Sequence, residues 1–326
     1  MSRLFLIIMA KIPFYKPPKT YSEQLQLLKD RGLKVKSDSK ALYLLERLSY
    51  FRLSGYWYPL LKGNKEFHLF KENSEFETAF KLYRFDRDFR LLVLRDIEKI
   101  EVAIRAKMVY ILSHSYSPFW FRDNTIFRSP DGLHDSLNIL KKEFDKSDEQ
   151  YIRAFKAKYS NSFPPCWMLL ELTSFGSLSM IYTQLKKGLP EKRQIADFFG
   201  LDAQTFASWV HSLTYTRNVC AHHARLWNRD LQITPRRILS PHFQWLNNDG
   251  VPNNKPYYLL SMMLYLLASI NPKNQMVYRL KVLLKKYPNV DVTAMGFPFN
   301  WEKEPLWKYK PTVKQRVRLF LTRKLN

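Results

Sequence analysis

The sequence predicts an all-α protein. Apolar residues recur at helical spacing in several long stretches, most clearly at Ile97, Ile100, Ile104, Met108 and Ile111. Sustained alternation of apolar and polar residues, the pattern of strands, is absent from the sequence, as are internal repeats and low-complexity tracts. We therefore expect a helical bundle with a small helical N-terminal region and a basic C-terminal segment.

Residues 1–70 are expected to form the small N-terminal region, in which 1–10 are disordered. Thr20 and Glu23 have the spacing of a capping box, which predicts a helix that ends near Gly32.

A second helix is expected over about 38–50, where leucines line one face. Ser54, Gly55 and Pro59 are expected to break regular structure after it, and a short extended piece is expected near 67–70.

Residues 71–290 are expected to form the main helical domain, and 291–326 a basic C-terminal segment. Caps, prolines and glycines divide the main domain into segments. The expected helices cover about 74–114, 131–159, 166–187, 190–199, a segment capped by Asp202, 257–270 and 274–287. The apolar run 257–270 is too short for a transmembrane helix and is interpreted as buried.

The net charge of the chain is +24, from 53 Lys and Arg against 29 Asp and Glu. An excess of this size favours polyanionic partners, either nucleic acid or an anionic membrane surface. The two cysteines, Cys166 and Cys220, lack CxxC spacing and fit a reducing cytoplasm. The N-terminal run MSRLFLIIMA is too short to cross a bilayer.

Residues 214–229, TYTRNVCAHHARLWNR, combine cationic and titratable side chains with residues of a buried helix. On a continuous helix, one polar face would hold Asn218, His222, Arg225 and Arg229, at about 0°, 40°, −20° and 20°. Arg217 would flank this face, and His223 would point toward the packed side. Alternatively, a new helix starts at Thr216, and its free N–H groups attract an anion. Both geometries give a phosphate site beside an imidazole.

This residue set suits RNA cleavage without a metal. His222 can move protons at the 2′-hydroxyl or the leaving oxygen, because imidazole titrates near neutral pH. Arg217 can stabilise the charge that develops on phosphate, and Asn218 can orient the imidazole. One chain supplies only one such set, so two copies facing each other would make a fuller site and a homodimer is expected.

Arg217-Asn218-x-x-x-His222 matches the R-x4-H motif of HEPN ribonucleases, and five blocks together resemble the Abi_2 (AbiD/AbiF-like) abortive-infection family. The blocks are 16-KPPKTYSEQLQLLKDRGL-33, 51-FRLSGYW-57, 85-FDRDFR-90, 167-WMLLELTSFGSLS-179 and RNVCAHHARLWN at 217–228. The resemblance implies a HEPN-type helical bundle and a toxin-like, metal-independent RNA endonuclease of bacterial phage defence. It also implies dimerisation and, in the AbiF subgroup, a small structured RNA partner.

Other residues are assigned supporting roles. Substrate contacts are expected from Arg225, Arg229 and the C-terminal residues Lys314, Arg316 and Arg318. Glu101 and Glu171 stand among apolar neighbours, where a carboxylate needs a partner, and are each expected to hold a buried arginine or to orient Arg217 or His222. His223 is expected to be a satisfied core or interface residue that supports the site from a second layer, with a catalytic role as the alternative.

Four other interpretations concern a metal site, DNA reading and two alternative functions. Cys220, His222 and His223 lack a second ligand pair at zinc spacing, so no metal or other cofactor is expected. Residues 194–210 imitate a helix-turn-helix, but 202–213 carry no Lys or Arg, so DNA reading is not expected. A non-catalytic HEPN-fold RNA-binding protein and a membrane-acting toxin are the alternative functions.

Overall fold

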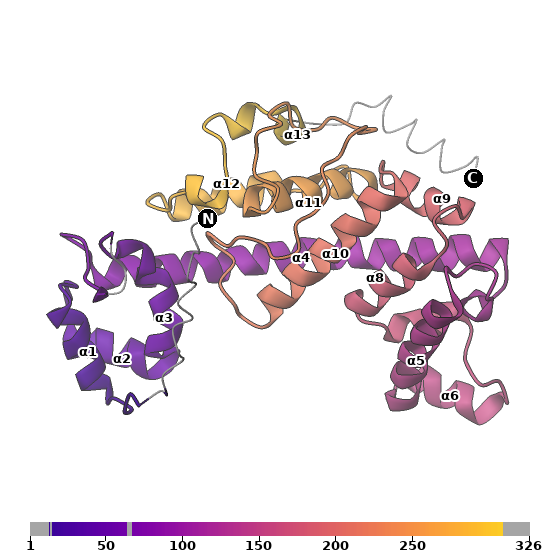
Figure 1. Ribbon diagram of the computed structural model, residues 1–326, viewed down its shortest axis with the longest axis horizontal. Coiled ribbons are helices and arrows are strands. Elements are labelled where there is room, and N and C mark those ends of the chain that lie inside the picture. Colours follow the sequence, from indigo (N-terminus) through magenta and orange to yellow (C-terminus); the bar gives the residue numbers. More distant parts are fainter. Residues whose placement is uncertain (1–12, 14, 64–66, 309–326) are drawn as a thin grey trace, which may run out of the picture. The chain divides into compact units, whose positions relative to one another are not determined.

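The computed structural model describes residues 13, 15–63 and 67–308, and Figure 1 shows its helices coloured along the sequence. Within these residues, regular structure is helical, and extended backbone pairs only as isolated bridges, for example between Leu61 and Phe70. The all-α prediction is therefore confirmed. The expectation of disorder at residues 1–10 and the RNA contacts expected at Lys314, Arg316 and Arg318 fall outside the described residues.

The chain divides into two compact units, Met1–Arg84 and Phe85–Asn326. The division falls inside α4 (Phe76–Ser115). The boundary expected at residue 70 lies within the first unit. Each unit is described by itself below.

The first unit contains α1 (Tyr21–Asp30), α2 (Asp38–Leu48), α3 (Tyr50–Trp57) and η1 (Tyr58–Leu60), followed by the start of α4. The capping box predicted at Thr20 and Glu23 is present, and Gly32 has a positive φ of 91° after α1, as expected for a helix-ending glycine. Leu28, Leu45 and Leu53 belong to its buried core.

The break expected at Ser54 and Gly55 is wrong, because α3 runs through both residues. The chain breaks earlier, at Ser49, whose φ is 66° and whose hydroxyl caps α3 by accepting the Arg52 N–H.

The second unit holds the remainder of α4 and the later helices. In chain order these are η3 (Trp120–Arg122), α5 (Pro130–Lys146), α6 (Gln150–Lys158), α7 (Cys166–Leu169), η4 (Leu170–Leu172), α8 (Phe175–Gln184), α9 (Pro190–Phe198), α10 (Ala203–Ala221), α11 (Pro256–Ile270), α12 (Met276–Lys286), η5 (Thr293–Met295), η6 (Trp301–Lys303) and α13 (Pro305–Lys308).

Two expected helices of this unit are interrupted. The helix expected over 131–159 is divided into α5 and α6 at Ser147, whose hydroxyl accepts the Glu149 N–H in place of a helical carbonyl. The helix expected over 166–187 is divided at Thr173, whose carbonyl accepts a hydrogen bond from Arg105 on α4, and Ser174 then caps α8.

The core of the second unit is built around α11. All of its residues except Ile270 are buried, as predicted for a helix that is apolar on every side. α10 packs against α8 and α9, and its side chains Trp209 and Leu213 are fully buried. Asp202 caps α10 as predicted by accepting the N–H groups of Gln204 and Thr205, each at 2.9 Å. These contacts fix the position of α10 and therefore the position of its last turn, which carries the motif.

Candidate active site at the end of helix α10

The residues of the R-x4-H motif lie on the last turn of α10 and directly after it. Arg217 is half-buried, whereas Asn218 and His222 are exposed. Arg217 Nη1 donates to Asn218 Oδ1 at 3.2 Å, so the amide contacts the guanidinium rather than the imidazole. The motif therefore presents a guanidinium and an imidazole to solvent at one end of a packed helix.

The continuous helix expected through Arg229 is wrong, because α10 ends at Ala221. The His223 N–H donates to the Cys220 carbonyl at 3.1 Å, and the Ala224 N–H donates to the Val219 carbonyl at 2.9 Å. These two bonds form a Schellman motif, in which the residue at the His223 position takes a left-handed conformation. His223 has a φ of 58°. Arg225 and Arg229 consequently lie beyond the helix.

Two further expectations about this stretch are corrected. A new helix does not start at Thr216, which is buried inside α10 and donates its hydroxyl to the Ser212 carbonyl at 2.9 Å. The motif is at a helix C-terminus, where carbonyl groups attract cations, so an anion must be held by side chains. His223 is exposed rather than packed, since the left-handed turn takes it off the helical path.

Arg229 lies outside α10, but its side chain contacts Tyr215 on that helix. Its Nε and Nη2 donate to the Tyr215 hydroxyl at 3.1 and 3.0 Å, and its Nη1 donates to the Arg225 carbonyl at 3.1 Å. Tyr215 precedes Asn218 by three residues and His222 by seven, a spacing that places all three on one side of the helix. Arg229 is thus held on the side of α10 that carries Asn218 and His222.

Asp86, which was not predicted as a site residue, fixes the chain immediately after the motif. Its Oδ1 accepts the N–H groups of Leu226 and Trp227 at 3.0 and 2.6 Å. Asp86 is fully buried on α4 and pairs with the buried Arg90 one turn later. Both residues belong to the FDRDFR block, and that block was the feature of the sequence that could have identified them as site residues. Asp86 and Arg90 thereby link that block to the motif.

Cys220 is buried next to this anchor. Burial raises the pKa of its thiol to about 12, and the Asp86 carboxylate also raises it, against the opposing effects of Arg90 and Arg229. A thiol in this state is a packing residue and a poor nucleophile or metal ligand.

Glu101 and Glu171 both contact Arg105. The Glu101 carboxylate accepts from Arg105 at 2.9 Å, and Glu171 lies 3.8 Å from the same guanidinium. Arg105 also donates to the Thr173 carbonyl at 3.0 Å. Glu101 therefore holds a buried arginine, as expected, and this cluster ties α4 to the turn between η4 and α8.

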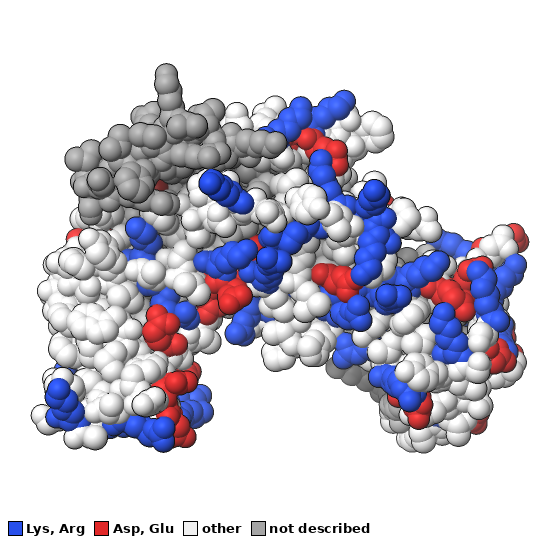
Figure 2. Space-filling view, turned by 180° about the vertical axis from the view of Figure 1, so that it is seen from behind, with Lys and Arg blue, Asp and Glu red and all other residues white. Residues whose placement is uncertain are grey.

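Positive charge is prominent on the surface. Figure 2 shows blue Lys and Arg side chains spread across the face in view, with fewer red carboxylates among them. Part of the positive charge is neutralised within the fold, since Arg279 pairs with the buried Asp96, and Lys286 and Arg87 pair with Asp88. Despite the opposing effect of burial, hydrogen bonds from Lys286, Arg87 and Tyr287 lower the pKa of Asp88 to about 2.

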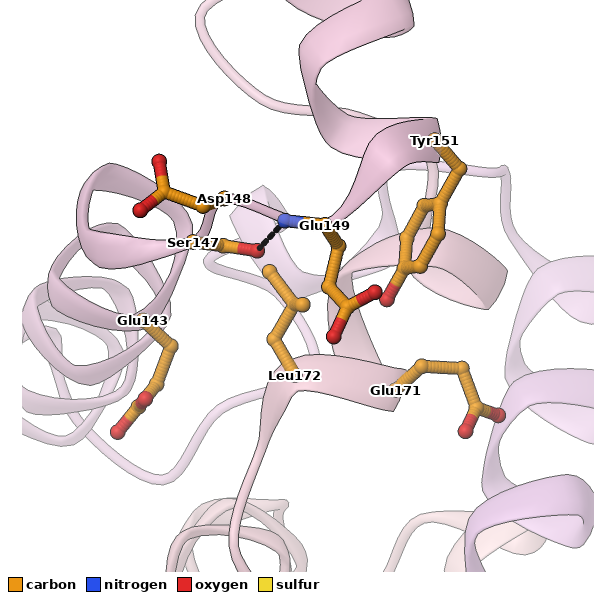
Figure 3. A pocket seen from close by; sticks show the side chains of 7 residues that line it. All are labelled: Glu143, Ser147, Asp148, Glu149, Tyr151, Glu171 and Leu172. Atoms are coloured by element: carbon orange, nitrogen blue, oxygen red, sulfur yellow. Dashed lines mark hydrogen bonds between the residues drawn. The ribbon is translucent and has the colours of Figure 1, made fainter.

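A hollow of about 480 Å³ elsewhere in the second unit has the opposite character (Figure 3). Its lining consists of Glu143, Ser147, Asp148, Glu149, Tyr151, Glu171 and Leu172. Burial and the carboxylates of Glu149 and Glu171 raise the pKa of Tyr151. Four carboxylates repel a phosphate group, so this hollow is not the place where a nucleic acid would bind.

Comparison with known proteins gave one family. The model of the family described as Abi-like protein matches residues 43–228, more than half of the chain. The match includes Asp86, Arg90, Arg217 and His222.

No curated protein and no solved structure matched the chain. None of the described helices has the length and apolar character needed to cross a membrane. The family suggests a role in abortive-infection defence against phage. By the extent of the family match, the chain belongs to the Abi-like family.

Proposed function

We propose that this protein is a toxin-like RNA endonuclease of phage defence that needs no metal ion and acts as a homodimer. The observation that carries the proposal is that His222 is exposed and Arg217 is half-buried, five residues apart at the end of α10. An RNA chain could not reach these two side chains if they were buried in the core, so their exposure is a requirement for catalysis.

The side chains have distinct roles in this proposal. His222 transfers a proton at the 2′-hydroxyl or at the leaving 5′-oxygen, and Arg217 stabilises the negative charge that develops on the phosphate. Asn218 accepts a hydrogen bond from Arg217 and so keeps the guanidinium in place. Arg225 and Arg229 hold the RNA backbone by charge, together with Lys314, Arg316 and Arg318 from the basic C-terminal segment.

The dimer follows from the number of groups that one chain provides. One motif supplies one guanidinium and one set of imidazoles at a single helix end, so a second copy facing the first would surround the scissile phosphate with cations. The RNA partners in the proposal are the substrate and a small non-coding RNA, the partner that the resemblance to the AbiF subgroup implies. Light scattering of the purified protein and sequencing of RNA that co-purifies with it test these two parts.

The catalytic proposal is tested with an RNA-containing oligonucleotide that has a single ribose in an otherwise deoxyribose strand, in the presence of EDTA. The wild-type protein should cut only after the ribose and leave a 2′,3′-cyclic phosphate. His222→Ala should lower the rate by about 10²–10⁴-fold, the usual contribution of a general acid or base. Circular dichroism of the variant should match the wild type.

His211→Ala is the matched control, because His211 is an exposed histidine on the same helix, about three turns before His222. It should cut at the wild-type rate. Equal cutting by the His222 variant, or cutting that EDTA stops and Mg²⁺ restores, would refute the proposal. Tight RNA binding without any new RNA ends would instead identify a binding protein that does not cut.

A further inference from the structure

The backbone of His223 adopts a conformation that costs energy. Its φ of 58° lies in the left-handed region, where a residue with a Cβ atom is less stable than glycine. His223 is at the position after the cap of α10, where glycine is the usual residue. The chain has a bulky imidazole at a position whose backbone geometry favours glycine.

The structure around His223 fixes this geometry from both sides. On the helix side, the Schellman bonds from His223 to Cys220 and from Ala224 to Val219 set the turn. On the other side, Asp86 holds the N–H groups of Leu226 and Trp227. The intervening residues have little freedom to relax, so the left-handed conformation belongs to the folded state.

The strained residue is also exposed and stands next to the exposed His222. On an uninterrupted helix, neighbouring side chains point about 100° apart, and His223 would face the packed side. The left-handed turn ends the helix at this point and leaves both imidazoles in contact with solvent. Strain of this kind tends to persist where a side chain is needed for function.

We infer that His223 is a second catalytic residue and that His222 and His223 form an acid–base pair for RNA cleavage; this inference rests on the proposed function. One imidazole, neutral at the start, accepts the proton of the 2′-hydroxyl as the 2′-oxygen forms a bond to phosphorus. The other, protonated at the start, gives its proton to the 5′-oxygen as the bond from phosphorus to that oxygen breaks.

The products of this step are a 2′,3′-cyclic phosphate and a 5′-hydroxyl, with the two imidazoles left in exchanged protonation states. Proton exchange with water then restores the starting state. Phosphorus is neither oxidised nor reduced, and no co-reactant is required. Arg217 stabilises the pentacoordinate charge in the same step.

The backbone part of the inference is tested by comparing His223→Gly with His223→Ala. Both variants lack the imidazole and its contacts, but only alanine retains the left-handed strain. The glycine variant should therefore unfold at a higher urea concentration than the alanine variant, although glycine has greater freedom in the unfolded chain. Both variants should lose RNA cleavage by about 10²–10⁴-fold.

His68→Gly is the matched control, since His68 is also exposed and has a φ of 53° but belongs to the first unit. It should relieve comparable strain and cut RNA at the wild-type rate. Full cleavage by either His223 variant would overturn the inference.

The chemical role is tested with an RNA whose leaving 5′-oxygen is replaced by sulfur. A thiolate leaves without protonation, so this substrate should restore cleavage to whichever alanine variant lacks the acid. Recovery of one variant, either His222→Ala or His223→Ala, supports the pair, whereas recovery of both or of neither refutes it. If the wild type cuts no RNA, the proposed function itself fails; if only the His222 variants are inactive, the inference about His223 alone fails.

Discussion

The Asp86 carboxylate accepts the backbone N–H of Trp227 at 2.6 Å, across 141 residues of sequence. The same oxygen accepts the Leu226 N–H, and the carboxylate is paired with Arg90 in a fully buried position. This contact holds the chain just after the two histidines, so the geometry of the proposed site depends on a residue far away in the sequence.

Replacing Asp86 with Asn should therefore disturb both stability and cleavage. The change leaves Arg90 without its charged partner, and breaking a buried ion pair typically costs about 3–5 kcal/mol. Amide hydrogen exchange should accelerate at Leu226 and Trp227, and RNA cleavage should fall at temperatures where the variant is still folded.

Asp96→Asn is the control for this prediction. Asp96 is equally buried on α4 but pairs with Arg279 on α12. It should lose comparable stability while it keeps the cleavage rate of the wild type and its slow exchange at residues 226–227. Equal loss of cleavage in both variants would show that Asp86 contributes only to general stability.

Tyr215→Phe tests the placement of Arg229. The change removes the hydroxyl that accepts two N–H groups of Arg229 but leaves the ring beneath the guanidinium. RNA should bind about 2–10-fold more weakly, as expected for a lost hydrogen bond, and the binding should depend as steeply on salt as before because no charge is removed. Tyr278→Phe, at an exposed tyrosine of α12, should leave the affinity unchanged. Fluorescence anisotropy at several salt concentrations measures both quantities.

Glu101→Gln separates a structural from a catalytic role for the Arg105 cluster. Loss of the charged hydrogen bond to Arg105 should lower the free energy of unfolding by about 1.5–3 kcal/mol, because both side chains are largely buried. Cleavage below the unfolding transition should stay at the wild-type rate. A variant that is as stable as the wild type but cuts slowly would show instead that Glu101 orients the motif.

Lys192 predicts a distinct dependence of stability on pH. Burial lowers the pKa of its ammonium group to about 7, with smaller contributions from Arg128 and Lys187, while the amine donates to the Thr183 and Leu185 carbonyls. In the unfolded chain the pKa returns to about 10.4. Between these values the unfolded state binds more protons, so the free energy of unfolding should rise with pH, by up to about 1.4 kcal/mol per pH unit.

Lys192→Met is the variant that isolates this contribution. Urea unfolding between pH 7 and 10 should show a smaller rise in stability for the variant than for the wild type, since only the wild type can lose this proton. Parallel curves for the two proteins would show that Lys192 keeps its usual charge when folded.

The sequence allowed much of the fold to be predicted because many helix boundaries depend on nearby residues. The capping box at Thr20 and Glu23, the cap at Asp202 and the apolar helix at 257–270 all depend on side chains within a few positions of the boundary. Periodicity alone was sufficient to predict the all-α class.

The errors arose where distant residues decide the local structure. The interruption at Thr173 depends on a hydrogen bond from Arg105, 68 residues away. The end of α10 was missed because His223, rather than glycine, has the left-handed conformation, and because Asp86 holds the chain beyond it from another helix. A helical wheel assumes an unbroken helix, so it misplaced Arg225 and Arg229.

The burial of both cysteines determines how they react with thiol reagents. Cys166 and Cys220 are buried, and burial raises the pKa of each thiol. Alkylating reagents and peroxides attack exposed thiolates, so neither cysteine should react while it stays buried. Because Cys220 lies inside the motif, its rate of alkylation would report openings that expose the last turn of α10.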